Sequence, residues 1–171
     1  VMISQAITIP RLIVSKHHGF DDLPKALKKH GFNKILLIVG QGIEELFKDK
    51  IDTLLYDSEL DITGPTILEE LEVEKISLIA YQLESYDVII SMGGGKAIDA
   101  GKYISFLRGF PFISVPTSIS NDGFASSGAS LMVSGQKKSV AAKMPYGVIA
   151  DLDILSTAPE RFYFSGLGDV V

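Results

Sequence analysis

The sequence predicts an α/β fold with a doubly wound, mostly parallel sheet and one inserted β-hairpin. Two observations lead to this fold class. Short, continuous apolar runs alternate with longer stretches of helical periodicity, and each apolar run closes at a glycine, proline or aspartate. Continuous apolar runs are typical of strands covered on both faces, which pair in parallel through right-handed crossovers.

Four runs are predicted to be strands, at 34–39, 87–91, 112–115 and 147–150. Helices are predicted at 21–30, 42–50, 65–83 and 97–107, where apolar residues recur at helical spacing and Gly31 and Gly109 stop the first and last. The hairpin has arms at 129–133 and 138–142 around a Ser134-Gly135 turn.

Composition sets the limits on function. The chain has 171 residues, of which 46% are hydrophobic and 22% charged, enough for one compact domain over 1–171. Its net charge of −5, without a basic stripe, argues against nucleic acid as a partner. It has no cysteines and no apolar run near the ~20 residues that span a bilayer, so we expect a cytoplasmic protein without membrane insertion.

The sharpest motif is a glycine loop, Gly93-Gly94-Gly95-Lys96, which follows a predicted buried strand and opens a helix. Glycines expose successive backbone N–H groups, and a helix N-terminus adds partial positive charge, so the loop is suited to a pyrophosphate. The alternative is a tight turn without a ligand. Three consecutive glycines exceed the need of a turn and favour the anion site.

A second loop, 116–127, also leaves the carboxyl end of a strand. Its small hydroxyls and the carboxylate of Asp122 suit a ribose, a nicotinamide amide or a polyol, although a plain polar surface loop has the same composition. Near the last residue, Asp169 offers a carboxylate for Zn²⁺ or Fe²⁺, with a cap or turn as the alternative. The three histidines, His17, His18 and His30, are predicted to be surface residues.

Together these motifs resemble a family. The segments GGGKAIDAGK, FISVPTSISNDGFAS, IADLDIL and SGLGD look like those of the glycerol-1-phosphate dehydrogenases, within the superfamily of iron-containing alcohol dehydrogenases, glycerol dehydrogenases and dehydroquinate synthases. The resemblance covers Asp87 to Val171, and the first eighty residues agree only in their βα pattern. It implies a Rossmann-like nucleotide-binding domain followed, in the parent protein, by a helical domain that this chain lacks.

The resemblance also implies roles for individual residues. Asp122 would bind substrate hydroxyls, and Asp169, in the segment 166–171 that begins the metal-binding part, would be the first metal ligand and would face the substrate. The residues implied in binding NAD or NADP are Gly94, Gly95, Lys96, Ala97, Ile98 and Asp99 under the pyrophosphate, Thr117, Ser118, Ile119 and Ser120 near the ribose and nicotinamide, and Ser126.

The implied reaction is hydride transfer between NAD(P)H and dihydroxyacetone phosphate, giving sn-glycerol 1-phosphate. One divalent metal, zinc before iron or nickel, would be completed by two histidines outside this chain, so we expect the 171 residues alone to be inactive. The whole protein is expected to be a homo-oligomer acting on a small polyol or polyol phosphate.

Two other hypotheses remain open. A glycerol dehydrogenase shares similar motifs, although the stretch Asn121–Ser126 and the region Lys138–Lys143 look closer to the glycerol-1-phosphate branch, and the Ser-Ser-Val-Gly-Gly-Lys run of dehydroquinate synthases is absent. A non-catalytic nucleotide-binding module would need a properly capped end, whereas Gly168–Val171 looks unfinished. The segment Val39–Gly42 has neither an acidic residue to select NAD nor an arginine to select NADP.

Overall fold

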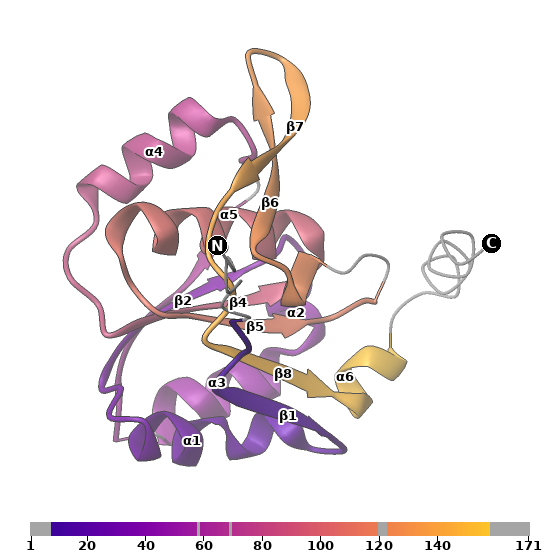
Figure 1. Ribbon diagram of the computed structural model, residues 1–171. Coiled ribbons are helices and arrows are strands. Elements are labelled where there is room, and N and C mark those ends of the chain that lie inside the picture. The colour runs from indigo at the N-terminus through magenta and orange to yellow at the C-terminus, as the bar shows by residue number, and fades with distance from the viewer. Residues whose placement is uncertain (1–7, 58, 69, 120–122, 158–171) are drawn as a thin grey trace, which may run out of the picture.

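A computed structural model describes residues 8–57, 59–68, 70–119 and 123–157. Its centre is a six-stranded sheet in the order β1-β8-β5-β4-β2-β3, and every neighbouring pair is parallel (Figure 1). The strands are β1 Leu12–Lys16, β2 Lys34–Val39, β3 Asp61–Ile67, β4 Val88–Gly93, β5 Phe112–Pro116 and β8 Gly147–Asp151. A separate antiparallel hairpin consists of β6 Gly128–Val133 and β7 Gln136–Ala141.

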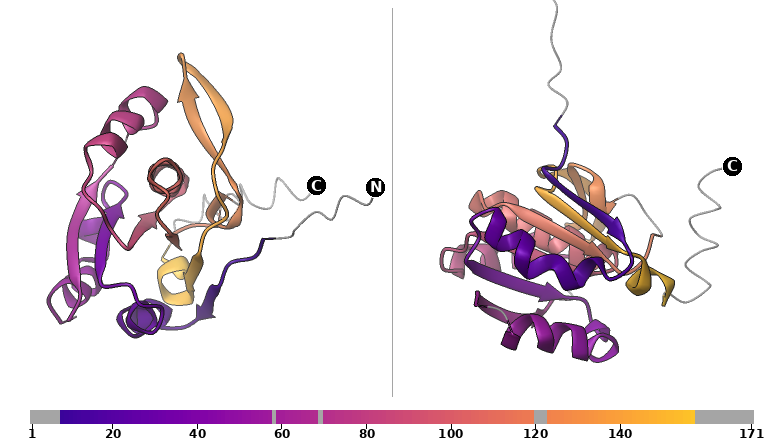
Figure 2. Two further views of the ribbon diagram at one scale, coloured as in Figure 1. Left: turned by 60° about the vertical axis from the view of Figure 1, so that its left-hand side comes forward. Right: turned by 90° about the horizontal axis from the view of Figure 1, so that it is seen from below.

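Helices cover both faces of the sheet, because successive residues of its central strands point to opposite sides. In β2, Ile35, Leu37 and Val39 join one core cluster, which includes residues of α1 Leu23–Lys29 and α3 Lys48–Asp57. Leu36 and Ile38 join a second cluster with α4 Val73–Gln82, α5 Gly95–Arg108 and the hairpin. Figure 2 shows α5 lying between α4 and the hairpin on that face. The remaining short helices are η1 Gly19–Asp22, α2 Ile43–Leu46, η2 Gly123–Ala125 and α6 Leu152–Ser156.

The doubly wound parallel sheet, its four central strands and the hairpin are confirmed. The hairpin turn has positive φ at both Ser134 (50°) and Gly135 (76°), as a two-residue turn of type I′ requires. The predicted helix over 65–83 is wrong in its first part. Residues up to Ile67 belong to β3, and the helix begins only at Val73. An edge strand tolerates Pro65 because one of its sides has no ladder partner.

Two of the six strands, β1 and β3, were not predicted, and both are edges of the sheet. The predicted short helix at 42–50 is divided into α2 and the start of α3, which runs on to Asp57. No helix among the described residues is long and apolar enough to cross a membrane.

The connections place the switch point of the sheet between β2 and β4. From β2 the chain moves outward to β3 across the face of α3, and from β4 it moves to β5 across the face of α5. Open α/β sheets bind ligands outside the carboxyl ends of the strands at such a point. At this point Gly40 N, just after β2, donates to Met92 O of β4 at 3.0 Å. The end of β2 therefore lies against the end of β4, which carries the glycine loop.

Candidate dinucleotide-binding site

The glycine loop joins β4 to α5 at the switch point. Gly93 allows close packing, whereas Gly94 borders open space. A Cβ on Gly93 would lie 3.0 Å from Ala97 Cβ and 3.2 Å from Gly40 N, so this residue lets two strand ends and a helix pack closely. Gly94 is the N-cap of α5, with φ −80° and ψ −170°, and a Cβ there would meet nothing nearer than Ser118 Oγ at 3.9 Å. The space above Gly94 is therefore open.

Backbone amides at the first turn of α5 are the available anion donors. Ile98 N–H donates to Gly94 O at 3.2 Å, which leaves Gly95, Lys96 and Ala97 as the helical residues whose N–H groups precede the first intrahelical bond. Ala97 and Ile98 are each only 2% exposed and pack into the protein. Ala97 can therefore reach a ligand only through its backbone N–H, and the N–H of Ile98 is already bonded to Gly94 O, whereas the Lys96 side chain is exposed.

The second predicted loop begins directly beside the first. Thr117 N donates to Gly93 O at 3.0 Å, and Ser118 Oγ is the nearest atom to the open face of Gly94. Ile119 is 50% exposed. The structure thus brings Thr117 and Ser118 to the glycine loop, while the predicted Ser120, Asp122 and Asp169 lie outside the described residues.

A buried lysine anchors the far end of this loop. Lys102, on α5, is 1% exposed, and its Nζ donates to the carbonyl oxygens of Gly123, Ser126 (2.9 Å) and Gly128 (2.9 Å). Ser114 Oγ donates to Phe124 O at 2.6 Å from β5. An ammonium group satisfied by three carbonyls can remain charged in the interior, so the chain from 123 to 128 is held tightly against α5.

Asp99, one turn before Lys102, docks the hairpin on the same helix. It is 9% exposed, and the backbone N–H of Ser130 in β6 lies close enough to favour its ionised form. Burial raises the pKa of Asp99, and the N–H of Ser130 together with the charges of Lys102 and Lys137 opposes that shift without overcoming it. Asp99 and Lys102 lie at i, i+3 spacing, so one stripe of α5 holds both the loop and the hairpin.

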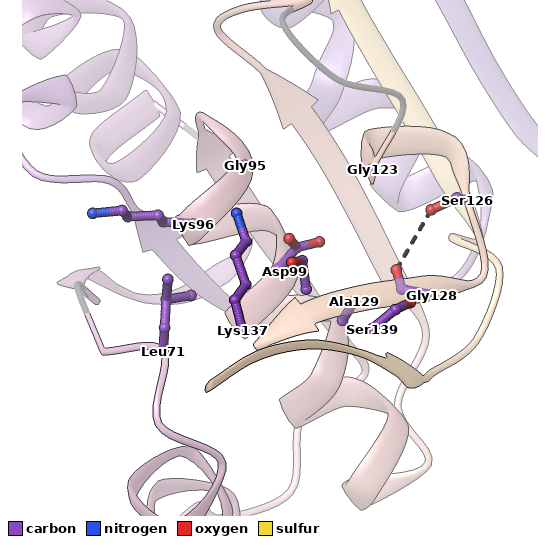
Figure 3. A pocket seen from close by; sticks show the side chains of 11 residues that line it. Leu71, Gly95, Lys96, Asp99, Gly123, Ser126, Gly128, Ala129, Lys137 and Ser139 are labelled. Atoms are coloured by element: carbon purple, nitrogen blue, oxygen red, sulfur yellow. Dashed lines mark hydrogen bonds between the residues drawn. The ribbon is translucent and has the colours of Figure 1, made fainter. Parts of the chain in front are cut away.

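These elements enclose a cavity of about 440 Å³ (Figure 3). On one side lies the first turn of α5, on another the loop end at Gly123 and Ser126, and opposite them the hairpin. The lining residues are Leu71, Gly95, Lys96, Asp99, Gly123, Ser126, Gly128, Ala129, Ser130, Lys137 and Ser139. The lining shares Gly95 and Lys96 with the first turn of α5 and lies next to the open face of Gly94, which is not itself part of it. Backbone amides, two lysines and several hydroxyls fit the diphosphate part of a dinucleotide.

The described residues do not fit a metal ion, because they contain no group of three or more His, Cys, Asp or Glu side chains that could hold one. The sequence-based reading missed Lys102, Ser114 and the cavity-facing Lys137. Lys102 stood inside the quoted GGGKAIDAGK motif, three residues after Asp99, and helical spacing was the available signal. Nothing in the sequence around Lys137 distinguishes it from an ordinary solvated charge, and only the packing of the hairpin beside α5 brings it to the cavity.

With this geometry established, comparison with known proteins identifies the class. The family model for iron-containing alcohol dehydrogenases matches residues 14–159, and the chain belongs to that family. It is 38% identical to a glycerol-1-phosphate dehydrogenase (NAD(P)+) from Methanococcus aeolicus, over 96% of this chain and 45% of that protein. Its identity to the enzyme of the same name from Thermococcus kodakarensis is 37%, over 100% of this chain and 46% of that protein.

Solved structures agree on the fold. The structure of glycerol dehydrogenase from Schizosaccharomyces pombe matches with a TM-score of 0.78 and 28% identity, over 97% of this chain and 43% of that one. A probable glycerol dehydrogenase from Sinorhizobium meliloti matches with a TM-score of 0.80 and 21% identity, over 97% and 46%. The chain therefore spans about half the length of the relatives that it matches.

Proposed function

We propose that residues 1–171 are the NAD(P)-binding domain of a dehydrogenase that interconverts dihydroxyacetone phosphate and sn-glycerol 1-phosphate. The observation that carries the proposal is the open face of Gly94 at the N-terminus of α5, at the switch point of the sheet. Identity above 30% to several glycerol-1-phosphate dehydrogenases supports the substrate.

In this proposal the chain binds and orients the cofactor. The amides of Gly95, Lys96 and Ala97 hold the diphosphate, and Gly94 lets it approach the backbone. Thr117 and Ser118, with Ile119 and Ser120 after them, lie toward the ribose and nicotinamide, and Ser126 contacts the cofactor from the loop that Lys102 anchors. The dinucleotide, once bound, supplies the hydride.

Asp122 and Asp169 are proposed as substrate-binding carboxylates. Asp169 is also proposed as the first ligand of a divalent metal, zinc before iron or nickel, with histidines from outside this chain. A soluble homo-oligomer in the cytoplasm remains the expectation for the whole protein.

Titration of NADH and NADPH fluorescence against a Gly94→Val variant tests the cofactor site. The backbone angles of Gly94 are allowed for any L-residue, and its Cβ would have room, so the fold should be preserved. The side chain would occupy the space proposed for the phosphate, and we expect affinity to fall at least tenfold, about 1.4 kcal/mol. Unchanged affinity in a variant with an unchanged melting temperature would remove the loop from the site.

The substrate is tested in the whole protein by comparing kcat/KM for dihydroxyacetone phosphate and dihydroxyacetone. We expect the phosphorylated ketone to be preferred. The second candidate, a glycerol dehydrogenase, is favoured by the similarity to the Schizosaccharomyces pombe structure, and a preference for the unphosphorylated ketone would select it.

A further inference from the structure

The β6–β7 hairpin carries two adjacent lysines that face in opposite directions. In the hairpin register Lys137 pairs with Met132 and Ser139 pairs with Ser130, so these four side chains share one face. Lys137, Ser139 and Ser130 all line the 440 Å³ cavity. Lys138 pairs with Leu131 on the other face, is itself exposed, and does not line the cavity.

The position of Lys137 relative to the glycine loop is set by the groups that dock the hairpin. Lys102 Nζ donates to Gly128 O at 2.9 Å, and Ala129 and Leu131 pack in the core cluster that includes α5, so the first residues of β6 are fixed against that helix. In Figure 3, Lys137 rises from β7 past Asp99 in the direction of Gly95, while Lys96 stands on the helix. Lys137 and Asp99 both line the cavity, and the charge of Lys137 slightly lowers the pKa of Asp99.

The charges around the cavity are unbalanced in favour of an anion. Lys96 and Lys137 are its exposed cations, and within the described part of the chain neither forms an ion pair at 4.0 Å or less. The one carboxylate of the lining, Asp99, is 9% exposed, and burial raises its pKa. Two ammonium groups and the positive end of α5 therefore outweigh a single carboxylate.

We propose that Lys137 is a phosphoryl-binding residue, and that the hairpin is the second wall of the anion site opposite the glycine loop. The inference rests on the proposed function, because it assigns a further contact within that site. The chemistry recognised is a phosphoryl group, which comes either from the cofactor diphosphate or from the phosphate of a phosphorylated ketone. Lys137 would donate charge-assisted hydrogen bonds to its oxygens.

The experiment compares Lys137→Met, Lys137→Arg and the matched control Lys138→Met in the whole protein. NADH affinity is measured by fluorescence titration at low and at high salt, and KM is measured for dihydroxyacetone phosphate and for dihydroxyacetone. Loss of a charge-assisted contact is expected to weaken binding about tenfold or more. Lys137→Arg keeps the positive charge and should recover most of the affinity, whereas Lys138→Met should behave like the parent.

The two measurements distinguish the cofactor diphosphate from the substrate phosphate as the group that Lys137 binds. Weaker NADH binding in Lys137→Met, with a smaller salt dependence than in the parent, assigns Lys137 to the cofactor diphosphate. Unchanged NADH binding with a raised KM for dihydroxyacetone phosphate alone assigns it to the substrate phosphate. If the parent binds NADH and Lys137→Met matches Lys138→Met in every measurement, the inference is overturned and the proposed function stands. If the parent binds neither dinucleotide, the proposed function fails and the inference fails with it.

Discussion

At the scale of single residues, α5 shows how a motif combines ligand binding with scaffolding. Its first residues face open space, while Asp99 and Lys102 are buried and hold backbone groups of the hairpin and the preceding loop. A sequence pattern identifies the motif but does not separate these tasks, because the tasks depend on which side chains the neighbouring elements cover. The resemblance implies that Asp99 contacts the cofactor, which stays a prediction; in the structure this residue is 9% exposed and lines the cavity beside Ser130.

Lys102 is expected to be the most important polar residue for stability. Lys102→Met keeps the length of the side chain but leaves the carbonyls of Gly123, Ser126 and Gly128 without their shared donor. We expect the free energy of unfolding to fall by about 2–4 kcal/mol in urea denaturation, with weaker NADH binding because Ser126 is displaced. The exposed Lys138→Met should change it by less than about 0.5 kcal/mol. Equal stability of the two variants would contradict the conclusion that Lys102 holds this loop against α5.

Replacing either of two aspartates, Asp99 or Asp87, by asparagine should change the stability of the protein at pH 7, in opposite directions. Burial raises the pKa of Asp99 above 3.8, so its ionisation costs stability at neutral pH, and that cost disappears as pH falls. Asp99→Asn keeps an acceptor for Ser130 N. We expect a higher melting temperature than the parent at pH 7, with the difference shrinking as pH is lowered toward 3.8.

The matched comparison is Asp87→Asn. The N–H groups of Asn33 and Lys34 each donate to Asp87 Oδ2 at 2.9 Å, which lowers the pKa of that carboxyl. Its ionised form stabilises the fold above 3.8, and this contribution is lost as pH falls through the folded pKa. Asp87→Asn should therefore be less stable than the parent at pH 7 and indistinguishable at low pH. Parallel pH profiles for the two variants would contradict the assignments.

At the scale of elements, burial determined what could be predicted. The central strands β2, β4, β5 and β8 are almost entirely buried and appear in the sequence as continuous apolar runs. The edge strands β1 and β3 are largely exposed, and their mixed composition leaves no such run. Pro65 and the apolar residues that follow it continued a helical stripe in the sequence, and only pairing with β2 makes Thr66 and Ile67 a strand.

The contact between α5 and β4 gives a prediction at this scale. A Cβ on Gly101 would overlap Ser91 Oγ and lie 3.2 Å from Phe112 Cε2, so Gly101→Ala should cost about 1–3 kcal/mol despite the better helix propensity of alanine. Ser91 is fully buried, and its hydroxyl has no hydrogen-bond partner among the described residues.

Ser91→Ala should therefore be neutral or slightly stabilising, since it removes a hydroxyl without a partner. The double variant should recover about 1 kcal/mol of the loss in Gly101→Ala, and denaturant melts of all four proteins measure this coupling. Simple additivity of the two changes would show that the overlap with Ser91 is not what limits the packing.

At the scale of the whole molecule, the sequence predicted that the two candidate ligand-binding loops lie together but not that the hairpin forms a wall of the cavity. Both loops follow central strands, and the carboxyl ends of parallel strands share one edge of the sheet, so their proximity was predictable. The wall formed by the hairpin depends on its packing against α5 beside Asp99 and Lys102, whose Nζ donates to Gly128 O. Those contacts join residues about thirty positions apart, and local patterns carry no information on them.

The metal provides the prediction for the molecule as a whole. We expect the dialysed 171-residue chain to hold far less than one transition metal per chain, because a tight site needs about three protein ligands. The whole protein should hold about one. In it, Asp169→Ala should abolish activity but spare NADH binding, since the carboxylate serves the metal and the substrate. Elemental analysis and cofactor titration measure the two effects, and a stoichiometric metal in the short chain would show that the site is elsewhere.

The pairing of β1 with β8 has a consequence for synthesis on the ribosome. Leu12 is paired with Gly147, and Phe20 N donates to Asp151 Oδ2 at 2.9 Å, so β1 and η1 dock on a strand made much later. At about 5–20 residues per second, β1 waits on the order of ten seconds for its partner. Nascent chains arrested before Gly147 should leave β1 open to proteases, and release beyond Asp151 should protect it. The first strand of the sheet to be synthesised, β1, is thus the last to be paired.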